Sequence, residues 1–482
     1  MHDPRSSAHA VVIGGSLAGT LTAAALAPHS GRITVIDRDV LPDTPLPRRG
    51  LPQARHAHVL WSGGARAMEA LLPGIHDLWH EHGAHRIPIP QGMLSFSPSG
   101  WFRRWHDEHP RHYAIGAGRD LMDWAVRQQL TRLHPHVTLR PACTPVRLLG
   151  DRRGVRGVEV RDHDGGTEAL EADLIVDATG RAAVGGALLR ALGVPEVAET
   201  RVDAGVVYAS RRYRAPAGAE RDWPIVSLQA DPSNGRPGGI GTIVPVETGE
   251  WFVSLSGTRG HHPTGDAAAF EDFARTLRHP VAADLLRRAE PVGDVTLSRS
   301  TPNVRRHYDK ARLPAGFLAV GDAATACNPV YGHGMSSAAR SALAVGRVAA
   351  ETGLRHRDFA KRARKAVARE ASAAWTLATG QDIFFTGVEA PAPPGAADRA
   401  ASWYVNALMN AAIGNHDVVQ RFTDVMMLEE PAGHLVTPGM VVAALRGPRV
   451  PKLGGPVLTP REQAVLDGAD PVATPTGPGA GG

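Results

Sequence analysis

Apolar and polar residues follow a strand-helix-strand pattern at the start of the chain. Residues 9–13 form an apolar run, residues 20–26 continue as a small-residue helix pattern, and residues 32–36 form a second apolar run. A glycine-rich turn joins the first run to the helix, and Asp37 follows the second run. The pattern predicts one β-α-β unit of about thirty residues.

Further along, the pattern changes from mixed helices and strands to strands in succession. Turn residues separate four strand candidates with no helix between them, which predicts an antiparallel meander distinct from the first sheet. After Gly334 the pattern is helical to about residue 445, and the segment after Pro451 is rich in Pro, Gly and Ala. The predicted helices are 62–72 and 119–133, and the predicted strands are 137–140, 155–161, 174–176, 205–213, 225–230, 239–246, 251–256 and 317–320.

The composition is that of a globular protein with a large core, because 43% of the 482 residues are hydrophobic and 21% are charged. Two cysteines, Cys143 and Cys327, offer neither metal-ligand spacing nor a disulfide framework, which predicts a cytoplasmic protein. No apolar run is long enough to span a membrane, so we expect no membrane partner. The net charge of +5 comes mainly from scattered arginines, so we expect no nucleic-acid partner.

Clustered histidines raise the question of a metal site. No acid or cysteine accompanies them at ligand spacing, so we expect no metal. The clusters are His56 with His58, then His80, His82 and His85, then His106, His109 and His112.

The glycine-rich turn has the residues that a dinucleotide phosphate needs. Gly14 allows a tight turn, Ser16 is small enough for a close backbone approach, and Gly19 lets the helix pack on the strand. The helix N-terminus then presents free N–H groups to the phosphates. Asp37 stands where an acid binds the ribose, but the unit alone does not separate FAD from NAD. The predicted contacts are Gly14, Gly15, Ser16, Leu17, Ala18, Gly19, Asp37 and Arg38.

A second segment decides between the two dinucleotides. The Gly316–Ala324 and Asn328–Ser337 segments resemble the Gly-Asp segment of the aromatic-hydroxylase class of FAD monooxygenases. The resemblance implies that Asp322 hydrogen-bonds the ribityl chain of FAD. It also implies that a helix opening at Gly334, Met335 and Ser336 points its N-terminus at the flavin, where it would stabilise negative charge on reduced flavin.

Two further segments resemble the same class. Arg119, at the start of a predicted helix, resembles the arginine that contacts the cofactor, and the 177–181 segment (Asp-Ala-Thr-Gly-Arg) resembles the acid-glycine turn. The resemblance therefore adds Arg119, Asp177 and Gly180 to the predicted cofactor contacts.

Three local sequences resemble the polyether epoxidases of monensin- and lasalocid-type ionophore biosynthesis: residues 48–58, 202–209 and 328–339. The first of them adds Gln53, Arg55 and His56 to the expected FAD contacts. The resemblance implies epoxidation of alkenes in a linear polyene polyketide, free or carrier-bound, through a C4a-hydroperoxyflavin. NAD(P)H would be the ultimate reductant, directly or through a flavin reductase.

An alkene attacks the distal oxygen of such a hydroperoxide directly, so no protein base is required and we name no catalytic residue. The protein would exclude water and hold the alkene in place. A long apolar pocket is expected between the meander and the flavin. Trp251, Val253 and Leu255 share one strand face and are expected either to line this pocket or to form the core of the second domain.

The predicted fold class is α/β: a Rossmann-type FAD-binding domain with an inserted antiparallel-sheet substrate domain and a helical C-terminal region. The FAD-binding domain would comprise residues 1–85, 110–195 and 295–350, and the substrate domain residues 86–109 and 196–294. Residues 351–450 would form the helical region, and residues 451–482 a disordered tail.

Other functions fit the same segments. An aromatic hydroxylase of this fold would need a phenolic substrate and usually a base. A flavin halogenase would use a lysine close to the flavin tunnel, whereas this chain has no lysine before Lys310. An alkene reductase shares the Asp-Ala-Thr-Gly turn, and a flavin-binding carrier or sensor without turnover belongs to another class.

Overall fold

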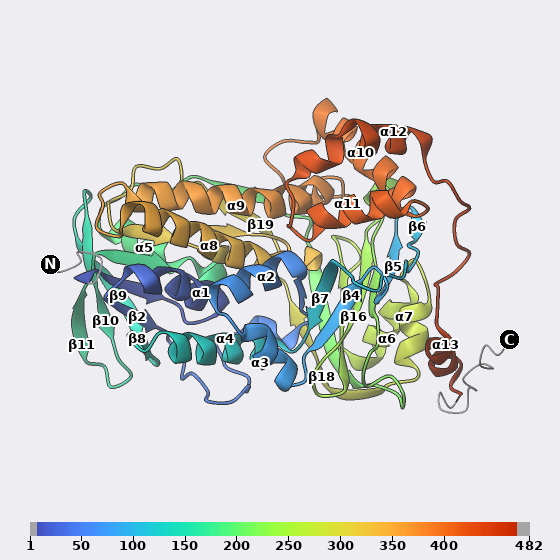
Figure 1. The fold of residues 1–482 in the computed structure, drawn as a ribbon, viewed down its shortest axis with the longest axis horizontal. Helices are drawn as coiled ribbons and strands as arrows, with labels where there is room; N and C mark the ends of the chain where they lie inside the picture. Colours follow the sequence, from blue (N-terminus) through green and yellow to red (C-terminus); the bar gives the residue numbers. More distant parts are fainter. Residues whose placement is uncertain (1–6, 470–482) are drawn as a thin grey trace.

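The computed structural model describes residues 7–469, and its first domain is built on a five-stranded parallel sheet. The sheet has the strand order β20-β12-β1-β2-β8, so β1 lies at its centre, between β12 and β2 (Figure 1). These strands are β1 (His9–Ile13), β2 (Arg32–Ile36), β8 (Val137–Arg140), β12 (Leu174–Asp177) and β20 (Phe317–Ala319).

Helices and a small meander cover this sheet. Helix α1 (Leu17–Leu26) packs against both α4 (Arg119–Leu133) and α8 (Gly334–Thr352), and α9 (Phe359–Asp382) packs against α8 and β20. The predicted β-α-β unit and the predicted helix at 119–133 are therefore confirmed. The meander and the neighbouring helix are β9 (Thr144–Gly150), β10 (Val155–Arg161), β11 (Thr167–Glu171) and α5 (Val184–Ala191).

The second domain is a seven-stranded sheet with the order β18-β14-β17-β16-β15-β5-β6. All four predicted strands are present, but β14 pairs with β17 rather than with β15, and β15 runs parallel to β5. A domain boundary at residue 295 is wrong because it cuts β18, which pairs with β14 from residue 290 to residue 298. The strands are β5 (Met93–Ser97), β6 (Gly100–Trp101), β14 (Val207–Arg214), β15 (Ile225–Leu228), β16 (Gly239–Pro245), β17 (Glu250–Gly257) and β18 (Glu290–Ser298).

The core of the second domain lies between this sheet and two helices, α6 (Ala267–Arg275) and α7 (Val281–Leu286). Trp251, Val253 and Leu255 are fully buried in this core. Of the two expectations for this strand face, domain core is therefore the correct one.

Two smaller sheets flank these domains. Their strand orders are β3-β7-β4 and β13-β19-β21. Strand β4 pairs with β7 and not with the seven-stranded sheet, so it does not belong to the second domain as predicted. The strands are β3 (Val59–Trp61), β4 (His85–Ile89), β7 (His112–Gly116), β13 (Glu199–Val202), β19 (Asn303–Arg306) and β21 (Thr325–Ala326), and helices α2 (Ser62–Leu71) and α3 (Ile75–Glu81) follow β3.

The C-terminal helices α10 (Ala396–Ala412), α11 (His416–Met426) and α12 (Pro438–Arg446) form a unit at the upper right of Figure 1. The expectation of disorder from residue 451 is wrong for part of that segment, because α13 (Pro460–Asp467) packs Val465 into the core of the second domain. A capping box between Thr459 and Glu462 starts this helix. Residues 470–482 lie outside the described residues.

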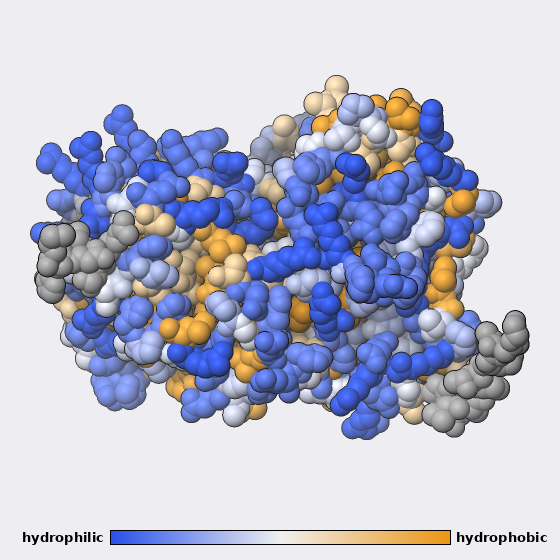
Figure 2. Space-filling model, in the orientation of Figure 1, coloured by the Kyte–Doolittle hydropathy of each residue, from blue (hydrophilic) through white to orange (hydrophobic). Residues whose placement is uncertain are grey.

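Polar residues cover most of the face seen in Figure 2, with apolar residues in smaller groups. Within residues 7–469, no helix has the length and apolar character needed to cross a membrane.

Candidate cofactor site

The phosphate turn between β1 and α1 has the geometry that its glycines predict. Gly14 has φ +109°, and a Cβ there would lie 2.6 Å from the Ala178 carbonyl oxygen. A Cβ on Gly19 would overlap the Gly14 carbonyl, so only glycine allows the helix to start so close to the strand.

Two other predicted turns lie against this one. Gly321 has φ +57°, and a Cβ there would lie 2.6 Å from the Ala18 Cβ. The 177–180 turn touches Gly14, as described, and Gly180 has φ +65° with open space where a Cβ would point. The structure thus brings together, at the C-terminal edge of the parallel sheet, three segments that are far apart in the sequence. This edge is where doubly wound sheets bind their ligands.

The surroundings of Arg119 indicate whether this edge of the sheet suits an anionic cofactor. Its side chain is buried, and Nη2 donates to the Ser16 hydroxyl over 3.2 Å, while the buried Nε has no partner. Burial lowers the pKa of Arg119. A buried guanidinium with a free N–H beside a helix N-terminus suits the pyrophosphate of FAD, so the residues fit the cofactor.

A buried ion network that the sequence analysis did not identify lies behind the turn. Arg48 contacts Asp37 over 3.3 Å and Asp123 over 3.2 Å, and Asp123 also pairs with Arg127. The Ser16 hydroxyl donates to Asp123 over 2.7 Å, and the Gly15 N–H donates to Asp37 over the same distance. Asp37 therefore holds the turn itself. The spacing of 119, 123 and 127 on one helix face was the available signal.

The other predicted cofactor contacts differ in how far they are exposed to solvent. Arg38, Gln53 and Arg55 are exposed. Asp177 is fully buried, and its carboxylate accepts from the Thr179 and Gly185 N–H groups, so it shapes its own turn.

Asp322 is a partly exposed acid on the turn next to α1. Its side chain is 40% exposed, and Oδ2 lies 3.9 Å from the Arg181 Nε. Its predicted contact with the ribityl chain stays a prediction, as do the FAD contacts of Arg38, Gln53, Arg55 and Asp177.

The 48–58 loop reaches the second sheet through His56. Nδ1 of His56 lies 2.8 Å from the Ser210 hydroxyl, which is 2.6 Å from the Ser254 hydroxyl. Burial lowers the pKa of His56 to about 4 and that of His58 to about 3, with nearby Arg55 and Arg119 adding to the respective shifts. Both imidazoles are therefore neutral at physiological pH.

Helix α8 begins beside this corner. Gly334 is exposed, whereas Met335 and Ser336 are buried, and the Ser336 hydroxyl has no partner. His333, which precedes the helix, hydrogen-bonds the Met426 carbonyl through Nε2 over 3.0 Å. Burial lowers the pKa of His333 to about 4.

A second buried network supports the turn that leads into α8. Asp382, the last residue of α9, accepts from Asn303 over 2.7 Å, Asn328 over 3.0 Å and the Tyr331 hydroxyl over 2.6 Å. Burial raises the pKa of Asp382. The sequence carried no signal for this residue, because its partners lie in segments distant from it along the chain.

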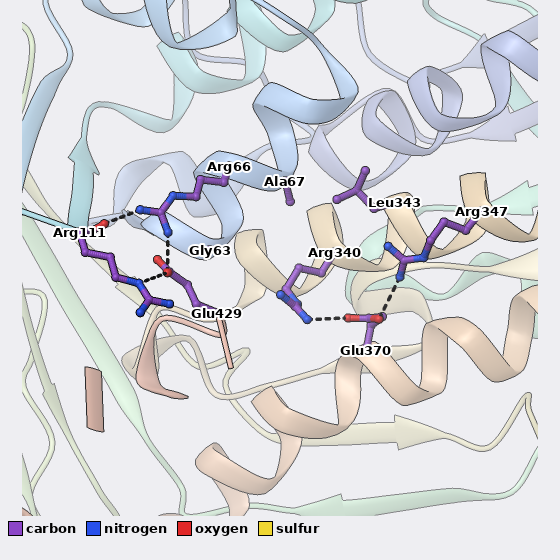
Figure 3. A pocket seen from close by; sticks show the side chains of 9 residues that line it. All are labelled: Gly63, Arg66, Ala67, Arg111, Arg340, Leu343, Arg347, Glu370 and Glu429. Carbon is purple, nitrogen blue, oxygen red and sulfur yellow. Dashed lines mark hydrogen bonds and ion pairs between the residues drawn. The ribbon is translucent and has the colours of Figure 1, made fainter. Parts of the chain in front are cut away.

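A hollow of about 310 Å³ lies outside this site, between α2, α8 and α9 (Figure 3). Arg66 and Arg111 contact Glu429 on one side of it, and Arg340 and Arg347 contact Glu370 on the other. Arg111 also contacts Asp424 and Glu430. Because these acids balance the arginine charges, we interpret the two sets of ion pairs as links between helices and loops rather than as an anion-binding site.

Three residues beside the hollow are close enough to hold a metal ion: His112, Asp424 and Glu429. His112 Nε2 lies 3.1 Å from Asp424, and Glu429 already binds Arg66 and the Ser62 hydroxyl. Although burial raises the pKa of Glu429, hydrogen bonds with His112 and Ser62 and the charge of Arg66 lower it to about 2. Two arginines on the same acids compete with a cation, so the cluster acts as an ion network joining α11 to α2 and β7.

The parallel sheet and its phosphate turn define a dinucleotide-binding domain, and a second domain built on a seven-stranded sheet adjoins it. The sequence model of the FAD binding domain family matches residues 7–361, and the chain belongs to this family. FAD is the cofactor that the family binds.

Known proteins resemble the chain over most of its length. "Protein Rv3254" of Mycobacterium tuberculosis is 29% identical over 388 residues, which cover 78% of this chain and 80% of that protein. The flavin-dependent brominase Bmp2 has a TM-score of 0.65 at 13% identity, covering 91% of this chain and 98% of its own. PqsL of Pseudomonas aeruginosa, described as a probable FAD-dependent monooxygenase, has a TM-score of 0.55 at 16% identity, covering 78% and 94%. The last two likenesses establish the fold.

Proposed function

We propose that the protein is an FAD-dependent monooxygenase that epoxidises alkenes of a linear polyene polyketide, free or carrier-bound. Bound and reduced FAD would supply, with O₂, an electrophilic oxygen. The turns around Gly14, Gly180 and Gly321 would hold the cofactor, with Arg119 on its pyrophosphate and the start of α8 at the flavin.

Neutral side chains at the junction of the two domains carry the proposal. His56 and His333 have pKa values of about 4, and burial raises the pKa of Tyr208 well above its ordinary value. An imidazole with so low a pKa is a poor acceptor for the proton of a phenol, whose pKa is near 10. Alkene epoxidation needs no such transfer, so these residues favour it over aromatic hydroxylation.

The lysines argue against halogenation, although a brominase shares the fold. All four lysines, Lys310, Lys361, Lys365 and Lys452, are exposed, and none lies among the buried groups of the site. A halogenase would need a lysine close to the flavin tunnel.

Mass spectrometry of the product tests the proposal. The protein would be loaded with FAD and incubated with a linear polyene acid, NADPH, a flavin reductase and isotopically labelled O₂. We expect a product with one or more labelled oxygen atoms, and none from a Gly14→Val variant that lacks FAD. A product with two added hydrogens and no oxygen would identify a reductase instead. Coupled oxygen uptake with phenols but not with the polyene would favour the aromatic hydroxylase, and no oxygen uptake with any substrate would favour a non-catalytic flavoprotein.

The route of the electrons needs a separate measurement. Mixing the FAD-loaded protein anaerobically with NADPH alone bleaches the flavin rapidly if reduction is direct. Bleaching that requires a reductase would show that a partner enzyme supplies the electrons.

A further inference from the structure

Exposed apolar side chains concentrate on the C-terminal helical unit. Ten large hydrophobic residues are exposed among those the structure describes, and five of them lie between residues 403 and 445. We name these five the apolar patch: Trp403, Val436, Val441, Val442 and Leu445, with exposed fractions of 59%, 62%, 37%, 43% and 69%. Apolar residues appear over α10 and α12 at the upper right of Figure 2.

Packing leaves three of these residues exposed on α12. Met440 and Ala444, four residues apart on α12, are buried against the unit's own core, which turns Val441, Val442 and Leu445 outward. The Tyr404 hydroxyl on α10 donates to the Leu435 carbonyl, which joins α10 to the segment before α12. A soluble surface rarely groups so many large apolar side chains without a partner.

Charge indicates which partner this is. Residues 431–461 contain no aspartate or glutamate, while Arg446 ends α12 and the exposed Arg449 and Lys452 follow it. The acids elsewhere on the unit are Asp398 on α10, Asp417 and Asp424 on α11, and Glu429 and Glu430 after α11. The last three already pair with Arg66, Arg111 and His112. An apolar patch beside basic residues matches an anionic lipid surface, where aliphatic and Trp side chains enter the interface and basic groups contact headgroups.

A second copy of the chain fits less well. In a symmetric contact the same patch lies on both subunits, so the basic residues Arg446, Arg449 and Lys452 of both copies would gather there with no acid of residues 431–461 to balance them. We therefore propose that α12, with Val436 before it and Trp403 on α10, forms a peripheral docking surface for anionic membranes. This inference revises the expectation of no membrane partner and is independent of the proposed reaction.

Vesicle flotation tests the docking surface with the full-length, FAD-loaded protein. We expect the protein to float with vesicles of phosphatidylcholine and phosphatidylglycerol, to float much less with phosphatidylcholine alone, and to be released by salt. A Val442→Glu/Leu445→Glu variant should lose at least about tenfold in partitioning, and so should Arg446→Gln/Arg449→Gln/Lys452→Gln.

Matched variants separate this effect from general changes. Val40→Glu/Leu46→Glu places the same two charges on other exposed apolar residues, and Lys361→Gln/Lys365→Gln/Arg369→Gln removes the same three charges from exposed positions on α9. Both should float like the unmodified protein, and flavin absorbance and circular dichroism confirm folding. The inference is overturned if the protein does not float or if the controls lose binding equally. It is also overturned if polyglutamate is bound as tightly as vesicles and Leu445→Glu has no effect, because that result would indicate an acidic protein partner. Dissociation of a dimer by Leu445→Glu without vesicle binding would also overturn it.

Discussion

At the scale of single residues, Ser16 shows how a departure from the glycine pattern is accommodated. The sequence predicted a role for the small size of Ser16, and in the structure its hydroxyl also donates to Asp123 and accepts from Arg119. The side chain therefore points to the ion network behind the turn and leaves the backbone N–H groups for the pyrophosphate.

Substitution of Ser16 should separate size from hydrogen bonding. We expect Ser16→Gly to purify yellow with FAD, since a glycine fits the turn. Ser16→Leu should purify colourless, because its bulk would displace Arg119 and crowd the phosphate. The ratio of flavin to protein absorbance measures both, and a yellow Ser16→Leu protein would mean that the pyrophosphate does not lie against this turn.

His333 should make stability depend on pH. Its pKa is about 4 in the folded protein, below the ordinary value of 6.5, so the unfolded chain binds a proton first as the pH falls. The stability contribution is complete above pH 6.5 and is lost as the pH falls from there toward 4. Between about pH 7.5 and about pH 5.5, His333→Gln should reduce the loss of unfolding free energy by about 1 kcal/mol, measured by urea unfolding. His163→Gln, at an exposed position, should leave the pH dependence unchanged.

At the scale of elements, one face of α4 joins the helix to the phosphate turn. Arg119, Asp123 and Arg127 are all buried on this face, and Asp123 serves both Ser16 and Arg48. Removal of one charge from such a network leaves the others unpaired.

Asp123→Asn should therefore destabilise the protein by about 3 kcal/mol and weaken FAD retention. Chemical unfolding and flavin content after dialysis measure the two effects. Asp77→Asn, on the exposed side of α3, is the matched control and should change neither. An Asp123→Asn protein of normal stability would show that Arg48 and Arg127 find other partners.

Elements with a strong internal pattern were predictable, and elements defined by their partners were not. The helix at 119–133 and the strands around 155, 174 and 239 carry their own periodicity. The short strands β3, β13 and β21 have two to four residues each and depend on pairing with distant segments. Helix α13 was missed because Pro and Gly surround it, although Thr459 and Glu462 form a recognisable capping box.

At the scale of the whole molecule, the candidate site also contains residues that were predictable from the sequence and residues that were not. The three glycine turns were predictable because a tight backbone turn leaves a sequence signature, and Arg119 was predicted from its resemblance to a cofactor-contacting arginine of FAD monooxygenases. Arg48, Asp123 and Asp382 were missed, because what makes them important is burial against residues brought together by the fold.

The segment after residue 450 also stabilises the second domain. Val465 is buried in the core of that domain, Arg104 pairs with Glu462, and Arg461 donates to the Gly218 carbonyl. Val465→Asp should lower stability by about 2 kcal/mol and expose the segment after residue 450 to proteases. Val457→Asp, at an exposed position, should have little effect. Thermal unfolding with limited proteolysis measures both, and equal behaviour of the two variants would mean that α13 contributes nothing to the domain.

The contact between Gly321 and Ala18 has a consequence for biosynthesis. Ala18 leaves the ribosome 303 residues before Gly321, which follows only after most of the family domain has been made. During synthesis, the phosphate turn at Gly14–Gly19 therefore exists for a long time without the Gly321 turn that packs against it. Cofactor loading must follow synthesis of the domain, so flavin-starved cells should accumulate full-length, colourless protein that turns yellow when riboflavin is restored.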